Sequence, residues 1–154
     1  MRHFTINYLE MNATNSFESE IIRHILLNEA IPNIGDAAGL PAAVTEGDVY
    51  ICLLTQAPGE AGDITNEAAY TGYARVAVPR GSLGWTEANG QAQNAAAVTF
   101  PECTGGSEDL KYFGICKTST GDDMMFHGEL PSPFPISQEM QPQYDIGQLA
   151  LNMN

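Results

Sequence analysis

Positive charge is scarce in this sequence. Six Lys and Arg residues stand against nineteen Asp and Glu residues, which gives a formal net charge of −13 at pH 7. Contacts to phosphate groups need clustered Lys and Arg side chains, so this balance argues against binding of nucleic acid. It also argues against docking to an anionic membrane surface. The composition favours a soluble protein whose partners are other proteins.

Cysteine and long apolar segments are equally sparse. The cysteines, Cys52, Cys103 and Cys116, are odd in number and form no C-x-x-C pair, which argues against a disulfide framework. Cys52 and Cys116 fall within strand-like runs, where we expect buried and unreactive thiols. No run approaches the roughly 20 apolar residues of a membrane span, and the N-terminal residues lack the apolar core of a signal peptide. We therefore expect synthesis and folding in a reducing cytoplasm.

The sequence also lacks the residue spacings that are typical of catalytic and metal sites. The histidines, His3, His24 and His127, lie far apart and form no ligand-spaced pair. Acidic residues in turns, as in Gly121-Asp122-Asp123-Met124, lack the alternating spacing and closing Glu of a calcium loop. No glycine-rich loop ending in Gly-Lys is present to hold a phosphate. The sequence predicts no catalytic residues, no bound metal and no cofactor, and therefore a protein that is not an enzyme.

The first fifteen residues differ from the rest of the chain, and we interpret residues 1–15 as an N-terminal arm. Large apolar side chains recur in it with a weak period of two: Phe4, Ile6, Tyr8, Leu9 and Met11. A free strand of this composition is sticky, and proteins avoid such a strand by pairing or covering it. The arm is a candidate attachment device that adds to a sheet edge or lies on a neighbouring subunit. The alternative is that it folds back as an edge strand of its own domain.

A helix is predicted over residues 16–30. Asn15 as N-cap places Glu18 at the third helical position, which is the reciprocal capping arrangement. Apolar side chains at helical spacing form a stripe that comprises Phe17, Ile21 and Ile25 together with Ile22 and Leu26. The face of Phe17, Ile21 and Ile25 is expected to pack on the β domain, and Pro32 ends the segment.

Short strand-like runs follow this helix and are separated by turn-forming residues. They cover residues 48–55, 72–79, 94–101, 109–118, 123–130 and 146–153, with turn signals such as Ala88-Asn89-Gly90 between them. This order predicts a mainly β protein, an antiparallel β-sandwich or jelly-roll-like domain with one short N-terminal helix. Residues 16–154 are expected to form this single domain.

Arg75 stands out because it interrupts an apolar run, Tyr73 to Val78, in a chain with few cations. A guanidinium in such a place needs acceptors, and its planar fork suits a carboxylate or loop carbonyls. Glu67 in the preceding loop is the nearest partner in sequence, with Glu129 and Asp109 as alternatives. We interpret Arg75 and Glu67 as a structural clamp that ties the loop of residues 56–70 to the sheet. A contact of Arg75 with a partner protein is the alternative.

The order of the punctuated strands resembles a family of small tailed-bacteriophage virion proteins commonly labelled phage tail fibre proteins. The resemblance spans residues 17–153, and its motifs are Asn66-Glu67, Gly72-Tyr73-Ala74-Arg75, Asn94 to Pro101 and Phe113-Gly114-Ile115. It implies a non-enzymatic structural protein of the virion that is assembled in the host cytoplasm. It also implies contacts with other phage structural proteins in the tail or capsid and a homo-oligomeric state.

Two other functions remain open at this point. A capsid decoration (cement) protein would use the arm across neighbouring capsid subunits. A carbohydrate-binding, adhesin-like module would need exposed aromatic side chains to bind a host surface glycan, and the candidate surface aromatics are Tyr70, Tyr73 and Trp85.

Overall fold

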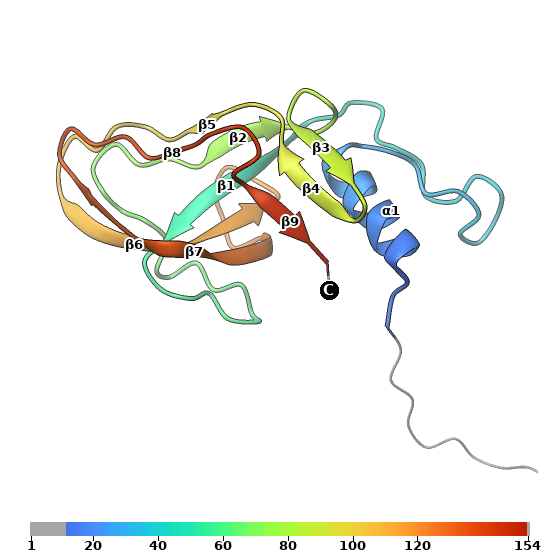
Figure 1. The fold of residues 1–154 in the computed structure, drawn as a ribbon, viewed down its shortest axis with the longest axis horizontal. Coiled ribbons are helices and arrows are strands. Elements are labelled where there is room, and N and C mark those ends of the chain that lie inside the picture. The colour runs from blue at the N-terminus through green and yellow to red at the C-terminus, as the bar shows by residue number, and fades with distance from the viewer. Residues whose placement is uncertain (1–11, 154) are drawn as a thin grey trace, which may run out of the picture.

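The computed structural model describes residues 12–153, which form one helix and nine strands (Figure 1). The helix α1 (Asn15–Leu26) comes first. The strands follow in chain order as β1 (Asp48–Leu54), β2 (Val76–Pro79), β3 (Trp85–Ala88), β4 (Gln91–Asn94), β5 (Val98–Thr99), β6 (Ser107–Cys116), β7 (Met124–Ser137), β8 (Gln143–Tyr144) and β9 (Ala150–Asn152). The protein is therefore mainly β and antiparallel with a single helix, which confirms the predicted fold class.

Four strands form the larger sheet, in the order β2-β1-β6-β7, with every neighbouring pair antiparallel. β1 lies inside this sheet, and Ile51 faces Val76 on one side and Ile115 on the other. This central position explains why the sequence of β1 is a continuous apolar run, since such runs are typical of strands that are covered on both faces.

Two smaller sheets make up the rest of the β structure, β3-β4-β9 and β5-β8. β3 and β4 form a hairpin through Asn89 and Gly90, whose φ angles of 55° and 80° are both left-handed. A two-residue turn of this kind fits the twist of paired strands and favours Asn-Gly. Figure 1 shows β3, β4 and β9 gathered at the end of the molecule that carries α1, while β5 and β8 lie toward the other end.

The helix is shorter than the sequence predicts, and its buried face is different. It ends at Leu26 rather than residue 30, because Asn28 takes a left-handed conformation (φ 57°) and the Leu26 carbonyl accepts from the Gly81 N–H. Its N-cap is Thr14, not Asn15. Ile22 and Leu26 are fully buried, and Ile25 is packed against them, whereas Phe17 is 37% exposed. The buried face therefore lies about one residue further around the helix than the predicted face of Phe17, Ile21 and Ile25.

Strand limits also differ from the prediction. The run that begins at Gly72 enters a strand only at Val76, so Arg75 precedes β2 instead of lying inside it. The predicted strand at residues 94–101 is divided between the end of β4 and the two residues of β5. β7 continues through three prolines to Ser137, seven residues beyond the predicted end.

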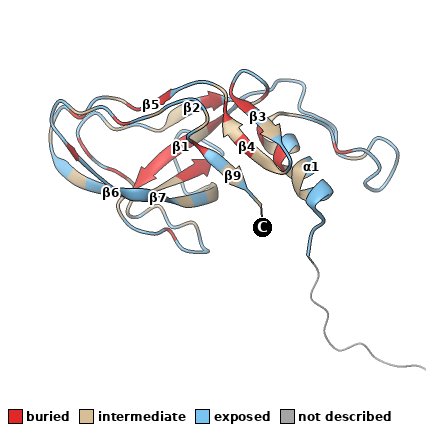
Figure 2. Cartoon of the chain, viewed as in Figure 1, coloured by how far each residue is buried: buried red, intermediate tan, exposed pale blue. Residues whose placement is uncertain are grey.

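The core lies between the larger sheet and the smaller sheets, and the helix closes one end of it (Figure 2). Trp85, Phe100 and Leu110 are among its largest buried side chains. Cys52 and Cys116 are buried in a second, smaller cluster with Leu54, as their places in strands predict. No helix among residues 12–153 is long and apolar enough to cross a membrane.

Candidate functional site

Arg75 is the most highly connected side chain that the sequence singled out. Its Nε and Nη2 donate to the two carboxylate oxygens of Glu67 at 2.9 Å each, which is the bidentate geometry. Nη1 donates to the Thr118 carbonyl at 3.0 Å, and Nη2 also donates to the Gly121 carbonyl at 2.8 Å. Nη1 further donates to Asp123 Oδ1 at 3.3 Å. All five N–H donors of the guanidinium are thus satisfied inside the same chain.

Glu67 is itself held in place by β1. Its neighbours pair with that strand, since the Ala68 N–H donates to the Leu53 carbonyl and the Thr55 N–H to the Asn66 carbonyl. The Tyr73 hydroxyl donates to Glu67 Oε1 at 2.8 Å and accepts from the Leu53 N–H at 3.0 Å. Arg75 therefore meets a carboxylate whose position is already fixed.

The two charged side chains of this site are shielded from water. The Arg75 side chain is 3% exposed, and that of Glu67 is 16% exposed. The hydrogen bonds that Arg75 donates to Glu67 raise the pKa of the guanidinium above its ordinary value, although burial opposes this shift. We call Arg75 and Glu67, with Thr118, Gly121 and Asp123, the Arg75 clamp.

The Arg75 clamp joins more of the chain than the sequence suggested. The pairing of Arg75 with Glu67 is present, whereas the alternatives Glu129 and Asp109 make no contact with Arg75. The turn between β6 and β7 supplies the remaining acceptors, and sequence reasoning missed it because those partners lie 43–48 residues away along the chain. The role of this constellation as a clamp stays a prediction.

The other two arginines of the described chain also bind within it. Arg80 donates from Nη2 to the His24 carbonyl and from Nε to the Ile25 carbonyl, both at 2.6 Å. These carbonyls belong to the last turn of α1, where free acceptors and the negative end of the helix dipole favour a cation. Arg23 donates from Nε to Glu87 Oε2 at 2.5 Å.

Glu87 connects the helix to the β3–β4 hairpin. Its side chain is completely buried, and it accepts from the Ser19 hydroxyl, from Arg23 Nε and from the Gly90 N–H. Burial alone would raise the pKa of the Glu87 carboxyl, but these hydrogen bonds outweigh it and hold the pKa below its usual value. Sequence reasoning missed Glu87, because its partners Ser19 and Arg23 lie 64–68 residues away along the chain.

The candidate surface aromatics are not on the surface, which corrects that prediction. Trp85 is fully buried, and Tyr70 is 4% exposed. The Tyr70 hydroxyl donates to the Pro101 carbonyl, and burial raises the pKa of Tyr70 to about 12. Tyr73 is half-buried and stacks with Phe100 at a centroid distance of 6.3 Å. Their large apolar area is better placed in the core than in water, so these three residues form no glycan platform.

The residues considered for chemistry are dispersed through the fold. His24 Nδ1 lies 2.7 Å from the Glu29 carbonyl, after the end of α1, and His127 lies in β7. Cys52 and Cys116 face each other with Sγ atoms 3.6 Å apart, and this contact together with burial raises the pKa of the Cys52 thiol. Within residues 12–153, no group of three or more His, Cys, Asp or Glu side chains is arranged to hold a metal ion. The arm residues Phe4, Ile6, Tyr8, Leu9 and Met11 lie outside the described residues.

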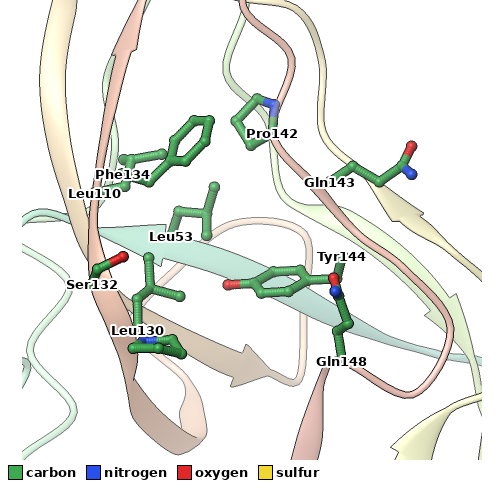
Figure 3. A pocket seen from close by; sticks show the side chains of 10 residues that line it. Leu53, Leu110, Leu130, Ser132, Phe134, Pro142, Gln143, Tyr144 and Gln148 are labelled. Carbon is green, nitrogen blue, oxygen red and sulfur yellow. The ribbon is translucent and has the colours of Figure 1, made fainter.

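An apolar cavity of about 360 Å³ opens beside β7, the edge strand of the larger sheet (Figure 3). β7 supplies one wall and the segment of residues 142–148 the other. None of its lining residues was singled out by the sequence.

A comparison with protein-family models identifies one family for this chain. The model described as "Podophage GP4 fiber I protein gp80" matches residues 12–152, which is nearly the whole described chain. A search of curated proteins found no match.

Proposed function

The chain belongs to the family of the podophage GP4 fiber I protein gp80, and we propose that it is a non-enzymatic structural subunit of a phage fibre. In this role it works through contacts with other virion proteins. Many weak contacts are sufficient on a particle, because repetition provides avidity.

The structural observation that supports the proposal is that the described arginines bind acceptors within their own chain. Arg23, Arg75 and Arg80 direct their guanidinium groups at acceptors of their own chain. Arg23 joins α1 to β3, Arg80 binds the last turn of α1, and Arg75 joins the loop that carries Glu67 to the β6–β7 turn. Side chains that recognise an anionic ligand or act on a substrate must keep donors free for it. In this protein the three arginines instead stabilise the fold. A rigid fold suits a structural component of a particle.

Placement in the fibre is part of the proposal, and the family description favours it over the capsid surface. The glycan-binding alternative has lost the exposed aromatic residues on which it depended, because Tyr70 and Trp85 are buried. We therefore retain one function and treat capsid decoration as an outcome of the test.

The test is a copy count on purified particles. Quantitative mass spectrometry against an internal standard should find the protein at a low copy number, and gold-labelled antibody should mark the tail. Hundreds of copies with label over the head would replace the fibre placement by capsid decoration. Absence of the protein from purified particles would overturn the proposal.

A further inference from the structure

The cavity between β7 and the segment of residues 142–148 is an opening into the core. Leu53 of β1 and Leu110 of β6 form its floor, and both are almost fully buried. Leu130, Ser132 and Phe134 alternate along β7 and line one wall, and Tyr144 lies opposite them (Figure 3). The volume of about 360 Å³ lies within the range of roughly 300–1,000 Å³ that is usual for ligand pockets.

The opposite wall is fixed rather than loosely placed. The buried Asn94 donates from Nδ2 to the Asp145 carbonyl at 2.9 Å, and its Oδ1 accepts from the Leu149 N–H at 2.9 Å. Tyr144 projects from this segment into the space between the walls, and its hydroxyl finds no partner among residues 12–153 (Figure 3). Phe134 remains 39% exposed at the mouth. An apolar space of this size, with a firm frame and an unpaired buried hydroxyl beside it, is a candidate docking surface.

Strand addition does not account for the occupant. β7 is the edge strand of the larger sheet, and it carries Pro131, Pro133 and Pro135 at every second position. Proline has no N–H and is tolerated only on the side of an edge strand that faces away from its partner. The free edge of β7 therefore lacks those three donors, and a ladder with a new strand would be incomplete there. The occupant must bind mainly by inserting side chains into the cavity.

The lining selects the chemistry of those side chains. None of the residues around the cavity is charged, so a charged group would lose its hydration there without a partner. The protein as a whole is strongly negative, so an inserted segment rich in acidic residues would be repelled. An apolar or aromatic side chain on a segment with few acidic residues fits both conditions.

One segment of the chain has this composition. Residues 1–11 contain Phe4, Ile6, Tyr8 and Leu9 with a single acidic residue, Glu10. Eleven extended residues reach about 36 Å, at roughly 3.3 Å per residue. The segment joins the body at the start of α1, at one end of the molecule, while β8 beside the cavity lies toward the other end (Figure 1). The proposed function, a subunit that repeats on a particle, favours the cavity of a neighbouring copy over the chain's own.

We propose that residues 2–11 of one copy bind in the cavity between β7 and residues 142–148 of the next copy, with Phe4 or Tyr8 inserted between Leu130, Phe134 and Tyr144. The contact joins different surfaces of the two copies, so it repeats head to tail and gives a row or a ring. This inference rests on the proposed function, since it assigns the surface through which one structural subunit binds another copy of itself.

Two variants test the proposal by complementation. A chain lacking residues 2–11 has an open cavity but no arm, and Ser132→Trp has the arm but an indole in the cavity. In sedimentation velocity the intact chain should associate, each variant alone should be monomeric, and an equimolar mixture of the two should form a 1:1 complex. Ser119→Trp, at an exposed turn position away from the cavity, is the matched control and should associate like the intact chain.

Several results would overturn the proposal. They are a mixture that stays monomeric, a truncated chain that associates as the intact one does, and an intact chain that is monomeric at every concentration reached. Near-ultraviolet circular dichroism verifies that each variant is folded, and Gln148→Trp replaces Ser132→Trp if that variant is not. Should the mixture fail while the truncated chain is still excluded from particles, the proposed function stands and only the binding place of the arm is wrong.

Discussion

At the scale of single residues, Arg75 shows how a cation that looked like a binding group is used within the fold. It binds the Glu67 carboxylate, in the loop beside β1, and two carbonyls of the β6–β7 turn, and water reaches only 3% of its side chain there. A buried ion pair is weak evidence of net stability, but the removal of one partner leaves the other charge unpaired.

Arg75→Met should therefore lower the free energy of unfolding by about 3–5 kcal/mol. Amide exchange should become faster at residues 66–68 and in the turn of residues 118–123, which lose their common donor. Lys117→Met, at an exposed position beside that turn, serves as the control and should change stability by less than about 0.5 kcal/mol. An unaltered exchange rate in both segments would show that Arg75 does not act as a clamp.

Glu87 gives a pH-dependent prediction. Its carboxyl pKa is lowered in the folded protein, so the stabilisation it provides is complete above the ordinary carboxyl pKa and is lost as pH falls through the lowered value. Glu87→Gln should cost roughly 1–3 kcal/mol at pH 7. Urea unfolding at a series of pH values should show the difference between the two proteins shrinking as the solution is acidified below about pH 4.5. A difference that is constant over this range would contradict the assignment.

At the scale of elements, the helix and the hairpin form one unit. Ile22 and Leu26 enter the core, Arg80 caps the last turn, and Glu87 holds Ser19 and Arg23. These contacts come from residues about 55–70 positions later in the chain, which explains why local sequence could predict the helix but not its exact end or face.

Ile22→Ala should accordingly destabilise the protein by about 2–4 kcal/mol, since it removes a fully buried side chain and leaves a cavity. Ile21→Ala is the matched variant at a half-buried neighbouring position, and its cost should be clearly smaller. Chemical denaturation of both proteins measures the contrast. Equal losses would mean that the helix rests on the face that the sequence predicted.

The sequence predicted the type of most elements well, because β1 and residues 112–116 of β6 carry apolar runs between turn formers. The Asn89-Gly90 turn was recognised, yet the flanking strands β3 and β4 were not, since Thr86-Glu87 and Gln91 to Asn94 are polar. The Arg75–Glu67 pair was accessible because the two residues lie eight positions apart. The cavity was not accessible, because its walls come from β1, β6, β7 and the segment of residues 142–148, which only tertiary structure brings together.

At the scale of the whole molecule, the net charge of −13 opposes contact between copies. Self-association then depends on uncharged surfaces, where apolar burial can exceed the long-range repulsion. The cavity beside β7 is such a surface, since its lining includes no charged residue. Added salt should strengthen association of the intact chain because it screens the repulsion between the copies. Sedimentation velocity at low and high salt measures this effect, and weaker association at high salt would indicate a contact made by opposite charges instead.

The arm gives the prediction that separates attachment from folding. Deletion of residues 2–11 leaves Thr14 in place to accept from the Phe17 N–H, so the helix cap is preserved and the free energy of unfolding should stay within about 0.5 kcal/mol of the intact protein. Incorporation of the truncated protein into particles should nevertheless fall sharply, because the arm provides the contact with a neighbour. A full-length chain with Phe4, Ile6 and Tyr8 replaced by Ser keeps the length of the arm but removes its anchors, and it should fail in the same way. Quantitative immunoblots of purified particles and urea unfolding of the isolated proteins measure the two effects. A large loss of stability on truncation, with incorporation reduced only as far as the lower stability explains, would contradict the attachment hypothesis. The arm would then be an edge strand of its own domain.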